Sequence, residues 1–148
     1  MSIAIPERIT AARAGTNPAV ICQLPSGWAV LCDVQFLRGY TILLADPVVA
    51  SINDLAHPQR AIYLRDMALI GDALLDVTGA YRINYGILGN SDPYLHAHIV
   101  PRYMTEPEKF RQGLPWTYPK KRVDGVAFDY ERDKELMQRI AAAIQKRV

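Results

Sequence analysis

The sequence has few cysteines and no large excess of charge of either sign. It contains 148 residues with two cysteines, Cys22 and Cys32, and no Cys-x-x-Cys pair. Two thiols in a chain of this length are typical of buried apolar side chains in a reducing compartment. Seventeen Lys and Arg stand against 15 Asp and Glu, a formal net charge of +2. This balance argues against binding to a nucleic acid polymer through bulk electrostatics, although a small phosphate-bearing ligand needs only a few local donors.

Long hydrophobic runs are also missing. No apolar stretch is long enough to span a bilayer, and the N-terminal residues do not combine a basic segment, an apolar run and a cleavage site. We therefore expect a cytoplasmic protein without a membrane partner. Half of the residues are hydrophobic and 22% are charged, as in an ordinary globular protein. The length suits one domain with one core over residues 1–148.

The pattern of apolar residues and turn signals predicts a small α+β domain. We expect helices over residues 6–14, 58–78 and 130–147, and strands over residues 19–24, 27–35, 40–45, 81–88 and 95–103. The proline-containing stretch 107–119 is expected to cross the surface. Short connections between neighbouring strands favour a mostly antiparallel five-stranded sheet, covered by the long central helix and the C-terminal helix.

The residues with chemical potential lie between positions 84 and 102. Alternate residues of a strand share a face, so Tyr94, His96 and His98 project together, while the intervening apolar residues face the core. Strand geometry sets the two histidine Cα atoms about 7 Å apart. One imidazole can then attack an electrophilic phosphorus while the other donates to an oxygen on it. Without further context, an isolated pair of this kind favours a metal-binding pair or two exposed strand residues instead.

A loop with small residues precedes the histidines. Gly89, Asn90 and Ser91 supply backbone N–H groups and short polar side chains. Such a loop can cradle phosphate oxygens, although it could also be a simple turn.

The wider pattern resembles the histidine triad (HIT) family of nucleotide hydrolases and transferases. The sequence Leu-His-Ala-His-Ile-Val-Pro-Arg at residues 95–102, preceded by Asn84-x-Gly and Ser91, is similar to the family's signature of three histidines that alternate with apolar residues. Residues 31–33 and 39–44 look like the family's two nucleotide-pocket strands. The resemblance covers about residues 19–103. It implies a HIT-like fold, cleavage at the α-phosphate of a nucleotide or nucleotide conjugate, and no cofactor or metal.

The resemblance also implies roles for individual residues. His96 matches the nucleophile that forms a covalent nucleotidyl intermediate, and His98 matches the histidine that contacts the phosphate and supports the leaving group. Asn84 and Ser91 match residues that form hydrogen bonds in the phosphate site. Asp33 aligns with a residue that often holds the ribose hydroxyls.

Two positions depart from the family pattern. Tyr94 replaces the first histidine of the triad, and Tyr40 stands where the family commonly has another histidine. A tyrosine can donate a hydrogen bond, but it cannot accept a proton near neutral pH. The alternative function is therefore a nucleotide-binding protein with little or no turnover. A metal site on His96 and His98 would need ligands beyond them, and His57 is remote in the predicted fold.

The family resemblance further implies a homodimer formed by the long helix and an adjoining strand. Tyr63, Leu64 and Leu69 lie outside the main apolar stripe of that helix and could face a partner. The sequence favours a packing role for Trp116 and a solvated charge for Arg102.

Overall fold

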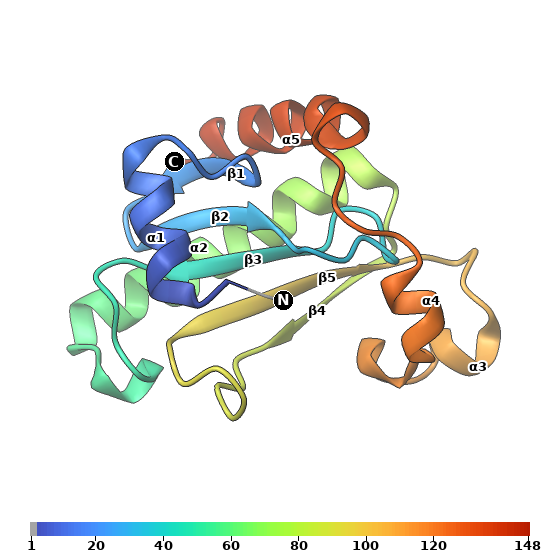
Figure 1. The fold of residues 1–148 in the computed structure, drawn as a ribbon, viewed down its shortest axis with the longest axis horizontal. Helices are drawn as coiled ribbons and strands as arrows, with labels where there is room; N and C mark the ends of the chain where they lie inside the picture. The colour runs from blue at the N-terminus through green and yellow to red at the C-terminus, as the bar shows by residue number, and fades with distance from the viewer. Residues whose placement is uncertain (1–2) are drawn as a thin grey trace.

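Five short apolar segments pair into one sheet in the computed structural model, which describes residues 3–148. The strands are β1 (Val20–Leu24), β2 (Gly27–Leu31), β3 (Thr41–Ala45), β4 (Arg82–Gly86) and β5 (His96–Arg102). They follow the order β1-β2-β3-β5-β4, and each neighbouring pair is antiparallel. Figure 1 shows this sheet at the centre of the molecule. The predicted α+β class and antiparallel sheet are confirmed.

Helices border the sheet. The α-helices are α1 (Ile5–Ala14), α2 (His57–Thr78), α3 (Glu108–Arg111), α4 (Lys120–Asp124) and α5 (Tyr130–Gln145), and the 3-10 helices are η1 (Ile52–Asp54) and η2 (Pro115–Thr117). Both α1 and α2 end at a glycine in the left-handed conformation, Gly15 with φ 75° and Gly79 with φ 76°.

Two sequence expectations about these elements are wrong. The second strand ends at Leu31 rather than at residue 35, because the chain then leaves the sheet. The stretch 107–119 is not a simple surface crossing. It contains α3 and η2, and it buries Pro115 and Tyr118.

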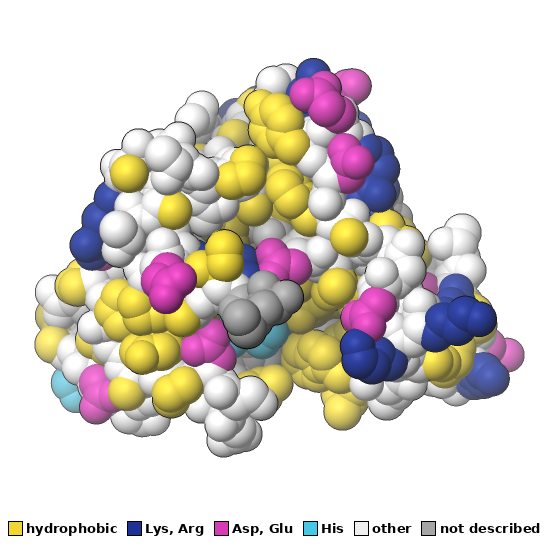
Figure 2. Space-filling model, in the orientation of Figure 1, with side chains coloured by type: hydrophobic (Ala, Val, Ile, Leu, Met, Phe, Trp, Pro, Cys, Tyr) yellow, Lys and Arg dark blue, Asp and Glu magenta, His cyan; other side chains and the backbone are white. Residues whose placement is uncertain are grey.

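The sheet has two different faces because its side chains alternate. One face packs against α2 and α5 through a large apolar cluster that includes Leu43, Ala97 and Ile99. On the opposite face, α1 covers one end through a cluster around Ile5 and Ile9. Residues between β5 and α5 cover the other end. Figure 2 shows a hollow between these two covers, with histidine inside it.

The helices of residues 3–148 are all too short or too polar to cross a lipid bilayer.

Candidate active site

Strand β5 carries both candidate catalytic histidines on the open face of the sheet. His96 lies opposite Leu44 of β3, and His98 lies between Ile42 of β3 and Gly86 of β4. The two imidazole rings are 4.9 Å apart between centroids, with an interplanar angle of 67°. His96 is only 9% exposed. The alternation of β5 therefore brings the two rings into contact.

The His96 ring is held by the backbone just before β5. Its Nδ1 lies 2.7 Å from the carbonyl oxygen of Tyr94. Because a carbonyl oxygen can only accept, Nδ1 must bear the proton, and in the neutral ring Nε2 keeps its lone pair. The side chain of Tyr94 instead packs against the apolar cluster under α1. Tyr94 thus touches His96 through its backbone.

The His98 ring meets a different pair of groups. Its Nδ1 lies 2.6 Å from the hydroxyl of Tyr40, and the indole Nε1 of Trp116 donates to the same hydroxyl over 3.3 Å. The Trp116 ring also contacts His98 edge-on, with centroids 5.4 Å apart. Burial, with a smaller contribution from His96, lowers the pKa of His98 to about 4. His98 is therefore neutral at physiological pH.

Trp116 is a site residue that the sequence does not reveal. It lies on η2, in the segment after β5 that has no period-2 or helical apolar pattern. A Cβ atom at Gly86 would lie 2.8 Å from the Trp116 ring. Gly86, opposite His98 in β4, therefore leaves the space that this ring fills. That glycine, two positions after Asn84, is the one sequence signal for a side chain packed over the strand.

Asp33 lies beside His96 although 62 residues separate the two in sequence. Both line a cavity of about 130 Å³ with an apolar floor from β2 and β3. The cavity is lined by Ile3, Ile5, Arg8, Val30, Leu31, Cys32, Asp33, Ile42, Leu44, Asp92 and His96. Arg8 of α1 binds the Asp33 carboxylate through both terminal nitrogens, at 3.0 and 2.6 Å. The Asp33 side chain is still 53% exposed, so the carboxylate remains accessible from solvent.

The other predicted binding residues do not line this cavity. Asn90 and Ser91 are exposed in the loop that connects β4 to β5, next to the cavity-lining Asp92. Asn84 is on the histidine face of β4, opposite Val100. Its Oδ1 accepts a hydrogen bond from Arg102 at 2.7 Å.

Arg102 is buried, contrary to the sequence interpretation of a solvated charge, with 2% of its surface exposed. Its guanidinium pairs with Glu106 and also donates to the backbone carbonyls of Phe110 and Gly113. Arg102 thereby fixes the segment that carries Trp116 to the end of the sheet.

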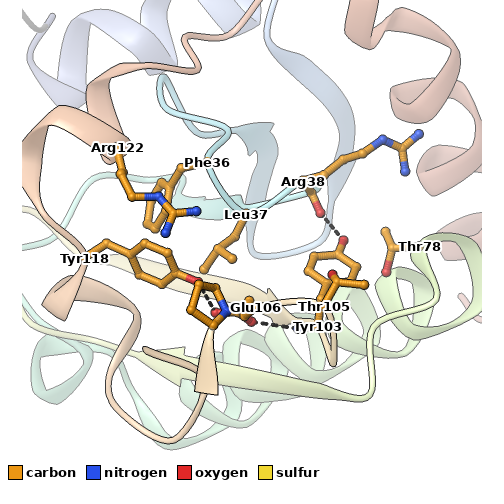
Figure 3. Close-up of a pocket in the computed structure, with 10 residues that line it drawn as sticks. Phe36, Leu37, Arg38, Thr78, Tyr103, Thr105, Glu106, Tyr118 and Arg122 are labelled. Carbon is orange, nitrogen blue, oxygen red and sulfur yellow. Dashed lines mark hydrogen bonds between the residues drawn. The ribbon is translucent and has the colours of Figure 1, made fainter. Parts of the chain in front are cut away.

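A larger cavity of about 360 Å³ lies at the far end of β5 (Figure 3). Three of its lining residues, Glu106, Tyr118 and Tyr103, are engaged in hydrogen bonds within its walls. Glu106 accepts from the Tyr118 hydroxyl and the Tyr103 N–H, and the Tyr103 hydroxyl donates to the carbonyl oxygen of Arg38. Neither His96 nor His98 lines it. The smaller cavity at His96 is therefore the candidate active site.

In the part of the chain that the structure describes, no three His, Cys, Asp or Glu side chains are arranged to hold a metal ion. His57, the third histidine, is at the start of α2 and is exposed.

Comparison with solved structures identifies the fold of this chain. No protein-family model matches the sequence, and no curated protein matches it. Solved structures do match. A histidine triad protein from Sinorhizobium meliloti has a TM-score of 0.68 and 23% identity, over 87% of this chain and 88% of that one. One from Marinobacter aquaeolei has a TM-score of 0.71 and 19% identity, over 86% and 88%.

A third similar structure is described as a hypothetical histidine triad nucleotide-binding protein from Sulfolobus tokodaii. It has a TM-score of 0.71 and 15% identity, over 95% of this chain and 92% of that one. At these identities the likeness establishes the fold. The chain has a HIT-like fold, as the motif around His96 predicts.

Proposed function

We propose that this protein is a nucleotide hydrolase or nucleotidyl transferase that cleaves at the α-phosphate through a covalent intermediate on His96. The main support is the 2.7 Å hydrogen bond from His96 Nδ1 to the Tyr94 carbonyl. In the neutral ring it leaves Nε2 with its lone pair, as a nucleophile requires. The HIT-like fold and the loop of small residues at positions 89–91 support a nucleotide as the substrate.

The reaction has two displacements. His96 Nε2 forms a bond to the α-phosphorus, while the bond from phosphorus to the leaving group breaks and the leaving group takes its electron pair. Water or another acceptor then attacks the phosphorus and gives up its proton to the released leaving group or to solvent. The P–N bond breaks, its electron pair returns to Nε2, and neutral His96 is restored. Because the pKa of His98 is lowered to about 4, His98 acts as a neutral hydrogen-bond donor to an oxygen on phosphorus. Such donors stabilise charge that develops in the transition state.

The cavity beside His96 suits a nucleoside. Its apolar floor, from residues such as Val30, Ile42 and Leu44, can pack against the flat face of a base. The Asp33 carboxylate can accept from the ribose hydroxyls, since each oxygen bonded to Arg8 retains a second lone pair. Asn90, Ser91 and Asn84 are proposed as further substrate-binding residues near the phosphate, and Tyr94 as a residue that acts indirectly, because its carbonyl holds His96 Nδ1.

The molecule is proposed to act as a homodimer of one-domain chains in the cytoplasm. Leu64 and Leu75 of α2 are exposed, as are Tyr81 and Tyr85 at the edge strand β4. A C₂ interface would cover this patch on both chains. Tyr63 cannot contribute, because it is fully buried and donates to the Leu43 carbonyl. The unpaired Cys22 and Cys32 are compatible with a reducing compartment.

Covalent labelling tests this function. The protein is mixed with a nucleoside phosphoramidate, quenched rapidly, and its intact mass is measured. We expect a gain of one nucleoside monophosphate in the wild type and in His57→Ala, the exposed-histidine control. His96→Ala should show no gain. His98→Ala should label about 10²–10³-fold more slowly, as when one preorganised donor is removed.

Two outcomes would contradict the proposal. A wild type that binds the nucleotide without gaining mass would support the alternative, a nucleotide-binding protein with little turnover. Labelling that persists in His96→Ala and is lost in His98→Ala would exchange the roles of the two histidines.

A further inference from the structure

We infer that Tyr40 and Trp116 are positioning residues that hold neutral His98 with its proton on Nε2, the opposite tautomer to that of His96. The catalytic consequence of this arrangement rests on the proposed function. The tautomer itself is a property of the free protein, so it can be measured whether or not the protein turns over a nucleotide.

The direction of each hydrogen bond follows from the chemistry of the groups. The Trp116 indole N–H can only donate, so in its 3.3 Å contact the Tyr40 oxygen accepts. The Tyr40 hydroxyl proton is then free to point to His98 Nδ1, 2.6 Å away. Since Nδ1 accepts this proton, the neutral ring carries its own proton on Nε2. Three residues from three separate parts of the chain thus fix one tautomer.

Burial keeps the hydroxyl protonated. Tyr40 is 3% exposed, and burial raises the pKa of its hydroxyl well above the ordinary value. The other titratable group near the hydroxyl is the thiol of Cys32, whose pKa burial raises to about 11. A thiol sulfur is a weaker acceptor than an imidazole nitrogen, so the Tyr40 proton goes to His98. His96, the remaining titratable neighbour, contacts the His98 ring.

The fold places Trp116 by a dedicated set of contacts. Gly86 leaves room for the indole over His98, and any Cβ there would meet the ring at 2.8 Å. Buried Arg102 fixes the preceding residues through the carbonyls of Phe110 and Gly113. These contacts place the indole against the histidine, while 42% of Trp116 is exposed to solvent.

The consequence is that the two neutral rings present different groups to a ligand. The neutral His96 ring offers a lone pair on Nε2, and the neutral His98 ring offers an N–H on Nε2. Because the pKa of His98 is far below neutral, this donor persists over the whole range above about pH 5.

Nitrogen NMR of the 148-residue protein tests the inference. Long-range ¹H–¹⁵N spectra of ¹⁵N-histidine protein at neutral pH report which ring nitrogen bears the proton. His57→Gln, His96→Asn and His98→Asn assign the three spin systems. We expect protonated Nδ1 in His96 and protonated Nε2 in His98. A His98 ring protonated on Nδ1 would overturn the inference.

Two variants separate the positioning roles. Trp116→Phe keeps a ring over Gly86 but removes the N–H, and Tyr40→Phe removes the donor to Nδ1. Each should shift the His98 nitrogen signals toward an average of the two tautomers and leave those of His96 unchanged. Trp28→Phe is the matched control, because the Trp28 indole donates to Asp46 instead. Unchanged His98 signals in Trp116→Phe would refute a positioning role for Trp116.

Kinetics provide a second readout. Trp116→Phe should lower kcat for a phosphoramidate by about 2- to 10-fold, the value of one hydrogen bond, with KM nearly unchanged. If the wild type has no activity, the proposed function fails, yet the NMR spectra still decide the tautomer. An activity loss without any change in the His98 signals would show that Trp116 acts structurally.

Discussion

The imidazole rings of His96 and His98 lie 4.9 Å apart, but their Nδ1 atoms face groups of opposite hydrogen-bonding character. His96 Nδ1 meets the carbonyl oxygen of Tyr94, and His98 Nδ1 meets the hydroxyl of Tyr40. Two residues of the same type, adjacent on the same face of one strand, therefore have different roles available to them. Their chemical difference comes from their neighbours, and variants of those neighbours should change it.

Asp33 should determine the preference for ribose. Asp33→Asn should weaken the binding of a nucleoside monophosphate by about 10- to 100-fold, since bonds to a charged acceptor contribute about 1.5–3 kcal/mol. The same substitution should weaken the binding of a 2′,3′-dideoxy analogue much less, because that analogue has no ribose hydroxyls to donate. Asp46→Asn is the matched control, because Asp46 also pairs with an arginine of α1, Arg13, but does not line the cavity. Equal losses for both ligands, measured by calorimetry, would assign Asp33 a purely structural role.

Tyr94 should act through its backbone. Its side chain packs under α1, and its carbonyl holds His96. Tyr94→Phe preserves both features, so the labelling rate should stay within about twofold of the wild type, less than the loss of one hydrogen bond. Tyr94→His should not raise the rate for the same reason. A large gain in Tyr94→His, measured by quenched-flow labelling, would show that this position takes part in proton transfer.

Arg102 should be essential for stability. Its partner Glu106 is buried, with 5% of the side chain exposed. Burial alone would raise the pKa of Glu106, but bonds from Arg102, Tyr118 and the Tyr103 N–H lower it below the ordinary value. Arg102→Met leaves this carboxylate unpaired and should cost about 3–5 kcal/mol of unfolding free energy.

Urea unfolding measures this cost. Lys120→Met breaks the exposed pair with Asp124 and should leave the midpoint unchanged, since exposed pairs contribute little. Arg102→Met combined with Glu106→Gln should recover part of the loss. If Arg102→Met has the same urea unfolding midpoint as Lys120→Met, the buried pair does not stabilise the fold.

The sequence predicts that His96 and His98 share one strand face because that signal is local. A period of two residues places His96 and His98 on one face, and glycines mark the ends of α1 and α2. Trp116 and Arg102 are different. Their positions depend on partners far along the chain, such as Tyr40 and Asn84, and on a segment without any repeating pattern. The spacing of apolar residues in the sequence does not predict such long-range contacts, so they are seen only in the folded structure.

Tyr63 shows the same limit within a regular helix. The apolar stripe of α2 leaves it outside the predicted core, but its hydroxyl reaches the Leu43 carbonyl at 2.8 Å. A tyrosine can be fully buried when its one polar group finds an acceptor. An apolar pattern alone does not indicate that the hydroxyl of a buried tyrosine has a hydrogen-bond acceptor.

Association should depend on the exposed face of α2 and β4. Leu64→Glu together with Leu75→Glu should convert a dimer to a monomer, because both side chains are 41% exposed on the patch proposed for the interface. Met104→Glu, at a residue that is 64% exposed outside this patch, is the control. Light scattering over a range of concentrations gives the mass. A monomeric wild type would refute the interface.

His98 should make the stability depend on pH. Its pKa is about 4 in the folded protein, against an ordinary value of 6.5. Between these values the unfolded chain binds a proton that the folded protein does not, so stability falls as pH decreases from 6.5 toward 4. Above pH 6.5 the ring is neutral in both states and contributes no slope. The slope is at most about 1.4 kcal/mol per pH unit, reduced by the solvent that reaches the half-buried ring.

Urea unfolding of wild type and His98→Gln at several pH values isolates this effect, because the carboxylates titrate in both proteins. The groups around the ring, His96, Tyr40 and Cys32, are also present in both. We expect the wild type to lose more stability than His98→Gln as pH decreases from 6.5 to 4, and His57→Gln to follow the wild type. Parallel curves for wild type and His98→Gln would mean that His98 takes up its proton equally well in the folded protein, so it would not be a neutral donor at acidic pH.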